Sequence, residues 1–582
     1  MNMLNEPGLM ASETISPSSL LTDNLPLLAG APNGIQKLRE LILELAVRGK
    51  LVPQDPNDEP ANKILARDVS GKSVSISKQK RSADLTTDTL AAHIKFEIPD
   101  TWQWVRFGEI AQHNSGKTLD KNRNKGVPRD YITTSNLYWG RFDLTNVRQM
   151  LIEESELARC TAIKYDLLIC EGGEAGRAAV WDHEDEICFQ NHIHRARFYG
   201  DINPYYVQRY FERINYSGEI TEYRKGVGIS NMSGKSLASI VLPLPPLNEQ
   251  HRIVAKVDEL MALCDRLEAQ QADAESAHAR LVQALLDSLT QASDADDFAA
   301  SWQRLAEHFH TLFTTESSID ALKQILLQLA VMGKLVPQDP NDEPASELLK
   351  RIVEEKARLV AEGKIRKQKE LAEVCDTDKA FELAKGWQWV KKAEILNFLN
   401  GYAFKSEWFT HKGVRLLRNV NVSHGVTNWK ETAYISEAQA SEFQNFFLKE
   451  NDIVLTLDRP LISTGLKYAV ISVSDLPCLL LQRVAKITPY AGAITVGYLS
   501  IWLNSSFFID AIDPGRSNGV PHISTGQVAS MLIALPPLAE QHRIVAKVDE
   551  LMVLCAQLKA RIGQLQQTQS HLANALVEQA VA

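Results

Sequence analysis

Apolar residues recur at spacings of four and three in two stretches that lie far apart in the chain. The first series is Ile253, Val257, Leu260, Cys264 and Leu267. The second series is Ile544, Val548, Leu551, Cys555 and Leu558. This spacing is typical of a helix that buries one face in a coiled-coil seam. Each stretch therefore predicts a long helix, and the first, from residue 249 to about 290, would span roughly 60 Å.

The two predicted helices are copies of one sequence. Residues 249–261 and 540–552 both read EQHRIVAKVDELM, and each copy follows a Leu-Pro-Pro-Leu segment. Proline is excluded from a helix interior, so the helices are expected to begin just after it. Glu249 and Glu540 then lie near the positive N-terminal ends. The repeat indicates an internal duplication in which the helices themselves have a structural role.

A second duplicated segment marks the end of a different helix. Residues 45–61 read LAVRGKLVPQDPNDEPA, and residues 329–345 read LAVMGKLVPQDPNDEPA. Each follows an amphipathic stretch. Gly49 and Gly333 fit helix C-caps, and a proline follows each of them soon after.

Two longer regions, 102–245 and 387–537, share only a skeleton. Both open with Trp-Gln-Trp-Val, which suits a strand whose tryptophans pack into a core. Asn136 in the first region aligns with Asn421 in the second. Short β-rich runs broken by Gly, Asn and Asp predict compact mixed domains with several loops. The pattern indicates one fold that carries two different surfaces.

The order of the repeats is circular. The middle segment, 246–386, contains both helical elements. The C-terminal segment, 538–582, contains only the first, and the N-terminal segment, 33–101, only the second. The sequence therefore predicts an α+β protein with two similar mixed α/β domains, separated by two long antiparallel coiled-coil helices in a pseudo-two-fold circular arrangement. Residues 1–32 match no motif and are predicted to be a disordered extension.

Composition narrows the functional classes. The net charge of -9 argues against a simple polybasic nucleic-acid binder. The excess acid lies in the helical parts, however, so the net charge does not exclude a locally basic cleft. The 7 cysteines form no CxxC pair, which disfavours a disulfide framework or a zinc site. The chain has neither a secretory signal nor an apolar run long enough to span a membrane, so we expect a cytoplasmic protein.

Motifs that would indicate catalysis are absent or incomplete. The segments 115–118 and 233–236 resemble the end of a P-loop, but Ala111 and Ile229 stand where its first glycine is required. The segment Asn203-Pro204-Tyr205-Tyr206 lacks the second proline of the amino-methyltransferase loop. His192, His194 and Glu186 are interpreted as ordinary strand or loop residues. The sequence predicts no catalytic residue and no metal site.

A duplicated fold with divergent polar loops suits a reader of two short DNA sequences, because base edges are read by Arg, Lys, Asn, Gln, Ser and Thr. The candidate DNA-binding residues of the first region are Lys117, Arg123, Lys125, Arg129, Thr134, Asn136, Arg177 and Lys225. Those of the second region are Lys405, Arg415, Arg418, Asn421, Arg459, Lys467, Arg516 and His522. Plain surface solvation is the alternative for any one of them. The basic linker runs at 78–81 and 364–369 are either solvated or in contact with phosphate.

The repeated Leu-Pro-Pro-Leu-x-Glu-Gln-x-x-Ile helix start and the LAV-GKLVPQDPNDEPA blocks resemble the specificity subunits of type I DNA restriction-modification systems, type IB in particular. The resemblance implies that 102–245 and 387–537 are target recognition domains, each reading one half of a bipartite asymmetric site in double-stranded DNA. It also implies that the helices dock two modification (methyltransferase) subunits, which restriction (translocase/nuclease) subunits join. This chain would bind no cofactor, with S-adenosylmethionine, ATP and Mg²⁺ on the partner subunits.

The resemblance implies that the apolar seam of each long helix forms an interface with another helix or with a partner subunit. The predicted interface residues are Ile253, Val257, Leu260, Leu267, Ile544, Val548, Leu551 and Leu558. The alternative is a coiled-coil scaffold that presents two protein-binding domains, and an orphan enzyme is a third possibility. Sequence-specific, salt-sensitive retention on DNA would separate the first reading from the scaffold.

Overall fold

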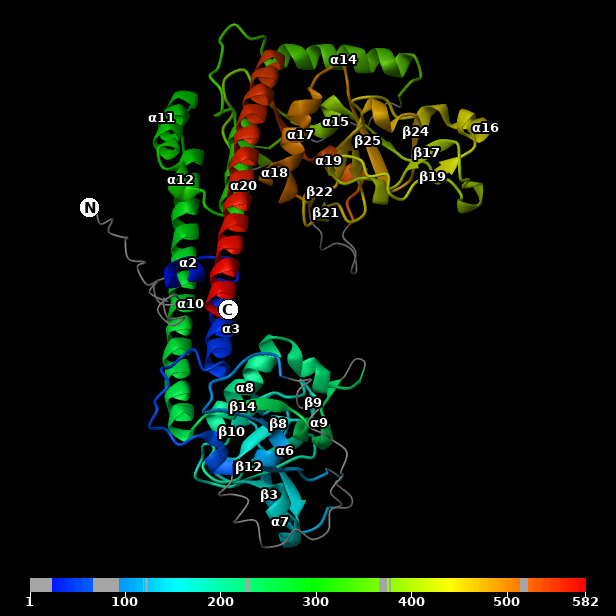
Figure 1. Ribbon diagram of the computed structural model, residues 1–582. Helices are drawn as coiled ribbons and strands as arrows, with labels where there is room; N and C mark the ends of the chain where they lie inside the picture. Colours follow the sequence, from blue (N-terminus) through cyan, green and yellow to red (C-terminus); the bar gives the residue numbers. More distant parts are fainter. Residues whose placement is uncertain are drawn as a thin grey trace, which may run out of the picture. The chain divides into compact units, whose positions relative to one another are not determined.

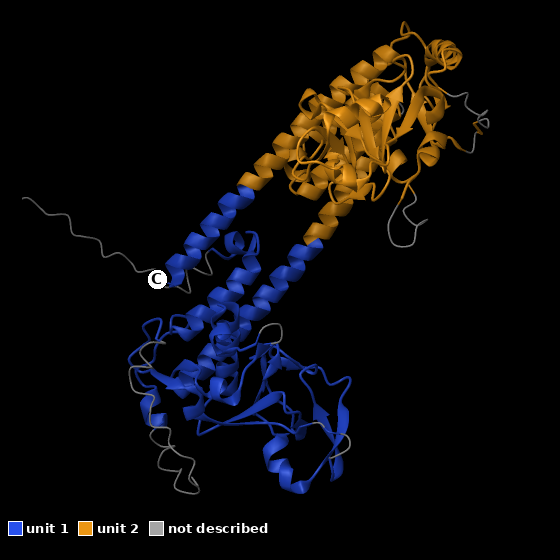
Figure 2. Ribbon diagram, turned by 90° about the vertical axis from the view of Figure 1, so that its right-hand side faces the viewer, with its two compact units in different colours: residues 1–273, 565–582 blue, residues 274–564 orange. Residues whose placement is uncertain are grey.

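A computed structural model describes residues 24–65, 94–118, 120, 124–226, 230–292, 294–365, 374–375, 378–512 and 522–581. The chain forms two compact units, which are coloured separately in Figure 2. Unit 1 holds residues 1–273 and 565–582, and unit 2 holds residues 274–564. Each predicted recognition domain therefore lies in a unit of its own.

The two long predicted helices are present (Figure 1). Helix α10 spans Leu247–Thr290 and helix α20 spans Leu538–Val581, each with 44 residues and a length of roughly 66 Å. Both begin directly after a Pro-Pro pair, as the sequence predicted. The unit boundaries fall inside these helices, so the chain leaves unit 1 along α10 and returns to it along α20.

In unit 1, helix α3 (Gly34–Val47) packs with the first part of α10 and the last part of α20. Arg39 donates hydrogen bonds to Asp265 and Glu268 of α10, at 2.6 and 2.8 Å. Beyond the end of α3, Lys50 donates to the carbonyl oxygen of Val581 at 2.9 Å. With Lys37 bonded to Asn574 and Gln54 to Glu249, α3 runs parallel to α20 and antiparallel to α10. The two long helices are therefore antiparallel within this unit.

In unit 2, helix α13 (Glu316–Val331) takes the place of α3, and the long helices exchange roles. Near the start of α13, Glu316 pairs with Lys559 of α20 at 2.9 Å. After its end, Lys334 donates to the carbonyl oxygen of Thr290, the last residue of α10, at 2.9 Å. The circular order of the repeats and their antiparallel helices are confirmed. Gly49 and Gly333 cap α3 and α13 with φ of 70° and 72°.

The identical helix starts fasten each recognition domain to its bundle. In unit 1, the Trp102 indole donates to the Glu249 carboxylate at 2.9 Å, and the Gln250 amide oxygen accepts from the Asn203 backbone at 2.8 Å. In unit 2, Trp387 bonds to Glu540 at 2.9 Å, and Gln541 accepts from the Thr495 backbone at 2.8 Å. Burial raises the pKa of both glutamates, against the opposing effect of these hydrogen bonds. The joint explains why Glu-Gln follows the prolines in both copies.

The seam residues pack inside their own units. Ile253, Val257 and Leu260 are buried in the core of unit 1, and Leu267 packs against that core. Ile544, Val548, Leu551 and the half-buried Leu558 do the same in unit 2. They form a helix interface as predicted. Their predicted contact with other subunits stays a prediction.

The recognition domain of unit 1 holds two four-stranded sheets. Their orders are β10-β8-β12-β2 and β6-β3-β11-β7, and β3 and β11 are parallel. Two-stranded pairings join β1 to β14, β4 to β5 and β9 to β13. The strands are β1 (Gln103–Arg106), β2 (Ala111–Ser115), β3 (Val127–Ile132), β4 (Leu137–Tyr138), β5 (Arg141–Phe142), β6 (Arg148–Ile152), β7 (Thr161–Ala162), β8 (Leu167–Cys170), β9 (Gly172–Gly173), β10 (Ala178–Val180), β11 (Ile187–Phe189), β12 (Ile193–Phe198), β13 (Ser230–Asn231) and β14 (Val241–Leu244). The helices are α6 (Phe107–Ile110), α7 (Glu154–Cys160), α8 (Pro204–Tyr216), the 3-10 helix η1 (Glu219–Tyr223) and α9 (Gly234–Ala238).

Unit 2 repeats this topology. The order β16-β25-β20-β23-β18 matches the first sheet with one strand added. The order β19-β17-β24 matches the β6-β3-β11 part of the second sheet, again with a parallel pair. The strands are β15 (Gln388–Lys391), β16 (Leu396–Asn400), β17 (Val414–Leu417), β18 (His424–Gly425), β19 (Ala433–Ile435), β20 (Ile453–Thr456), β21 (Leu461–Ile462), β22 (Gly465–Leu466), β23 (Tyr468–Val470), β24 (Cys478–Leu480), β25 (Val484–Pro489) and β26 (Leu532–Leu535). The helices are α11 (Ala295–Ala306), α12 (Phe309–Leu312), α14 (Ala345–Ala361), α15 (Lys392–Ile395), α16 (Glu437–Ala440), α17 (Val496–Asn504), α18 (Ser506–Ile509) and α19 (Thr525–Ser530), with 3-10 helices η3 (Ser406–Trp408), η4 (Asn419–Asn421), η5 (Ser441–Phe446) and η6 (Val473–Asp475).

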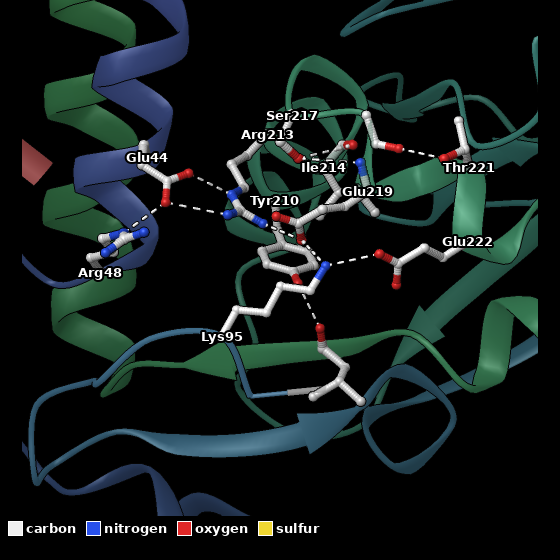
Figure 3. A network of polar contacts seen from close by, with 12 residues as sticks. Glu44, Arg48, Lys95, Tyr210, Arg213, Ile214, Ser217, Glu219, Thr221 and Glu222 are labelled. Carbon is white, nitrogen blue, oxygen red and sulfur yellow. Dashed lines mark hydrogen bonds and ion pairs between the residues drawn. The ribbon is translucent and has the colours of Figure 1, made fainter. Parts of the chain in front are cut away.

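An ion-pair network ties α3 to the recognition domain of unit 1 (Figure 3). The Arg213 guanidinium of α8 donates to Glu44 of α3 at 2.7 Å and to Glu219 at 2.6 Å. Its side chain is 6% exposed. Burial by itself would raise the pKa of Glu44, but the hydrogen bonds and positive charges of Arg213 and Arg48 together outweigh it and lower that pKa. The network fixes the recognition domain on its helical support.

The range 1–32, predicted to be a disordered extension, contains a helix. Residues Leu25–Ala29 form helix α2, and the Leu28 side chain is buried against unit 1. Residues 1–23 and the basic run at 78–81 lie outside the described residues. Among the residues described, no helix combines the length and apolarity that crossing a membrane requires.

Candidate nucleic-acid interface

A polar loop of the same construction stands in both recognition domains. In unit 1, the buried Asn136 amide donates to the carbonyl oxygens of Asp143 and Asn146, at 2.9 and 3.2 Å. In unit 2, the buried Asn421 amide donates to those of Asn428 and Glu431, at 3.0 and 2.8 Å. Each side-chain oxygen also accepts from the backbone N–H three residues earlier. Both asparagines therefore hold the loop in the free chain, and their predicted contact with DNA stays a prediction.

A short antiparallel pairing closes the next part of this region. In unit 1, Gly172 of β9 lies opposite Asn231 of β13. In unit 2, Asp458 bridges to His522. The backbone arrangement is the same, but the side chains are glycine and asparagine in one unit and aspartate and histidine in the other.

The turn before the central strand supplies another equivalent position. The carbonyl oxygen of His192 accepts from the Glu171 backbone N–H at 2.8 Å. The carbonyl oxygen of Arg483 accepts from the Leu457 backbone N–H at 2.9 Å. His192 and Arg483 thus occupy one place in the common backbone.

Equivalent positions around this region carry different residues in the two units. They are Thr134, Gly172, Gly173, His192 and Asn231 in unit 1, and Asn419, Asp458, Arg459, Arg483 and His522 in unit 2. At the joints with the helices, by contrast, the tryptophan, glutamate and glutamine are identical in the two units. We call this region the variable hollow.

In unit 1, the structure brings Thr134 and Arg177 together at the hollow. The Arg177 guanidinium donates to the Thr134 carbonyl oxygen at 2.6 Å and pairs with Glu174 at 3.0 Å. The exposed Lys225 lies on the adjoining segment, backbone-paired with Asn231.

Other predicted residues of unit 1 lie elsewhere. Lys117 forms an ion pair with Glu156, so its positive charge is already balanced within the domain. Lys125 is exposed just before β3, and Arg129 is exposed on that strand. Arg123 lies outside the described residues.

In unit 2, the structure gathers Arg459, Lys467 and His522 at the hollow. The Lys467 ammonium donates to the Asn419 side chain and carbonyl oxygen, at 2.6 and 2.9 Å. Burial and the nearby positive charge of Arg459 lower the pKa of Lys467. Asp458 accepts from His522 at 2.5 Å.

The remaining predicted residues of unit 2 have partners away from the hollow, or border it. Arg415 donates to the carbonyl oxygens of Ser474 and Leu476 and lies 4.8 Å from the ring of Trp429. Lys405 lies near Glu407, at 3.7 Å. Arg418, next to the hollow, donates to the Glu431 carbonyl oxygen at 2.7 Å. Arg516 lies outside the described residues.

Sequence reasoning missed Asp458 and Arg483. A search for basic and amide side chains does not select a carboxylate such as Asp458, and no motif marks Arg483. A pairwise comparison of the repeats could have found them, since each stands at a site of difference beside matched backbone motifs.

No group of three or more potential metal ligands is present among the described residues. His194, considered above with His192 and Glu186, is buried and its ring bonds to the Met232 carbonyl oxygen at 3.0 Å. Its other neighbour, Glu171, lies 3.7 Å away. The contacts suit a packed strand residue.

Comparison with known proteins identifies the class. The family model "Type I restriction modification DNA specificity domain" matches residues 99–275 and 384–567. These two matches cover the two recognition domains and the helix starts. The chain belongs to the specificity subunits of type I restriction-modification systems, the DNA-recognition components and not the catalytic ones.

Individual relatives agree with this assignment. The chain is 47% identical over 572 residues to the type I restriction enzyme EcoAI specificity subunit of Escherichia coli, covering 94% of each chain. It is 35% identical over 577 residues to the EcoEI specificity subunit of Escherichia coli, again covering 94% of each. A solved structure described as the structural basis of complex assembly and conformational transition of the type I R-M system shares the fold, with a TM-score of 0.50 and 16% identity, over 84% of this chain and 99% of that one.

Proposed function

We propose that each recognition domain reads one half of a bipartite, asymmetric DNA site through its variable hollow. One observation carries the proposal: the same backbone pairings present different side chains at equivalent positions of the two units. Readers of the same sequence would need the same side chains, because base edges are distinguished by donors and acceptors. Two different hollows therefore suit two different half-sites.

The exposed part of the helix repeat supports docking of two identical partners. Core packing accounts for the identity of buried residues such as Ile253 and Ile544. It does not account for Ala255 and Ala546, which are exposed and equally identical. Glu259 and Glu550 are a further exposed pair. One surface presented twice fits one kind of subunit bound twice, and we assign it to two modification subunits.

The remaining assignments follow from family membership. Restriction subunits would join the assembly. S-adenosylmethionine, ATP and Mg²⁺ would be bound by the partner subunits, and the complex would act in the cytoplasm. The chain itself would contribute recognition only.

Methylation mapping tests the proposal. The chain is co-expressed with the modification subunit of its system, and the host DNA is sequenced for methylated adenine. The expected result is one split motif whose two halves differ. Expression of the modification subunit alone is the control and should leave no motif.

Exchange of a recognition domain sharpens the result. Replacing residues 102–245 by the same region of another specificity subunit should change one half of the motif and leave the other intact. A stable complex that methylates no motif would favour the scaffold alternative. A change in both halves would contradict independent reading by the two domains.

A further inference from the structure

The hollow of unit 2 contains a polar pocket. A cavity of about 350 Å³ is lined by Asn419, Asp458, Arg459, Arg483 and His522. They come from the loop after β17, the turn after β20, the turn before β25 and the segment before α19. Segments remote in sequence thus converge on one small polar space.

Asp458 organises this pocket. One carboxylate oxygen accepts from the Arg483 guanidinium and the other from the His522 ring, each at 2.5 Å. The Asn419 amide holds the Asp458 backbone by donating to its carbonyl oxygen at 2.7 Å. Both carboxylate oxygens are therefore occupied by protein donors.

The Arg483 side chain is fixed on one edge and open on the other. It is 65% exposed, whereas the Asp458 side chain is 18% exposed. Only one of its terminal nitrogens bonds to Asp458. A guanidinium carries five N–H donors in a planar fork, so a second edge remains to meet a ligand. The aspartate reduces the freedom that the long side chain would lose on binding.

Backbone strain points to the same two arginines. Arg459 and Arg483 have φ of 47° and 70°, in the left-handed region that non-glycine residues rarely adopt. The position equivalent to Arg459 in unit 1 is Gly173, with φ of 79°. Strain of this kind is retained where the side chain serves a function. Unit 2 thus places an arginine where the fold favours glycine.

We propose that Arg483, oriented by Asp458, determines the specificity of unit 2 by reading a guanine. The inference rests on the function proposed above. Guanine presents two acceptors, N7 and O6, in the major groove, which match the free edge of the guanidinium fork. Adenine replaces one acceptor by a donor and would oppose an arginine N–H. Arg459 adds positive charge beside the same pocket.

The equivalent positions of unit 1 do not offer this reading. His192 takes the place of Arg483 and Gly172 that of Asp458. Their nearest arginine, Arg177, is 18% exposed and bonded to Thr134 and Glu174. The guanine contact is therefore specific to the half-site of unit 2.

The test uses the full chain in complex with its modification subunits. Methylation motifs are mapped for the unchanged chain, Arg483→Ala and Asp458→Asn, after exchange of residues 387–537 has identified the half-site of unit 2. Arg483→Ala should relax one guanine of that half, with its preference over the other bases falling about 10- to 100-fold. Asp458→Asn should relax the same position less.

Two variants control for folding and for place. Lys412→Ala removes a positive charge from an exposed residue of unit 2 outside the hollow, and it should leave the complex assembled and the guanine preference in place. His192→Ala, at the equivalent position of unit 1, should leave the half-site of unit 2 unchanged. A motif of Arg483→Ala identical to that of the unchanged chain would overturn the inference while leaving the proposed function standing. The absence of any motif with the unchanged chain would overturn both.

Discussion

The Lys50 side chain donates a hydrogen bond to the carbonyl oxygen of Val581, 531 positions later in the chain. Lys334 makes the same bond to Thr290, only 44 positions away. In the second case the two helices, α10 and α13, are joined by the segment that holds α11 and α12, and in the first they come from opposite ends of the chain. One helical junction is therefore built twice, once by a covalent connection and once by packing alone.

This relationship predicts that the chain tolerates circular permutation. Joining Ala582 to Met1 and opening the chain between residues 292 and 293 exchanges which junction is covalent. Because each bundle keeps its contacts, we expect a folded protein with the same methylation motif. Thermal unfolding and methylation mapping measure the two outcomes.

A cut inside α10, between residues 260 and 261, is the matched control. It interrupts the buried seam and should lower the melting temperature. Equal loss of stability in both permutants would contradict the equivalence of the two junctions.

Replacement of Asn421 by alanine should destabilise unit 2 without touching a base-reading residue. The change removes the buried amide that bonds to the carbonyl oxygens of Asn428 and Glu431 and to the backbone N–H of Arg418. The expected loss is about 2–4 kcal/mol in the free energy of unfolding, measured by urea denaturation. The exposed Asn400→Ala should change it by less than about 0.5 kcal/mol. An unaffected stability in Asn421→Ala would show that the asparagine is free for another role.

The buried carboxyl groups at the helix starts should make stability depend on pH. Burial raises the pKa of Glu249 and Glu540 above the ordinary value of 4.5. The folded chain then binds these protons more tightly than the unfolded chain, so their contribution to stability falls as pH rises from about 4.5 through the raised pKa values. The Glu249→Gln, Glu540→Gln double variant should lose this part of the dependence.

Melting temperatures recorded across that pH range provide the measurement. The exposed pair Glu259→Gln, Glu550→Gln is the control and should follow the unchanged chain. If the Glu249 and Glu540 variant also follows the unchanged chain, the two carboxyl groups do not titrate in this way.

The exposed faces of the helix repeat should control how many partners bind. Ala255→Arg places a long charged side chain on one copy and should reduce binding from two modification subunits to one. Ala546→Arg should do the same at the other copy, and the double variant should bind none. Native mass spectrometry counts the subunits.

Gln557→Arg provides the control, because it installs the residue that stands at the equivalent position of α10, Arg266. Both positions are exposed, and the variant should still bind two subunits. If the Ala255→Arg, Ala546→Arg double variant still binds two subunits, the docking surface lies elsewhere.

The sequence by itself determined the architecture. Periodic apolar positions predicted the two long helices, and exact internal repeats predicted their circular order. Both patterns can be read from the sequence without knowing how the chain packs. The lack of a complete catalytic motif and the resemblance to specificity subunits both agree with the family assignment. Even the paired Asn136 and Asn421 were visible as a shared skeleton.

Only the tertiary structure decided what individual polar residues do. The sequence predicts Asn136 and Asn421 as DNA contacts, and only the structure shows that their amides bond to backbone carbonyl groups. Asp458, Arg483 and His522 converge from segments separated by strands and turns, so no linear spacing predicts their hydrogen bonds. Whether a polar side chain bonds within the fold or can bind a ligand depends on its neighbours in space. Those neighbours are fixed by the packing of the whole domain.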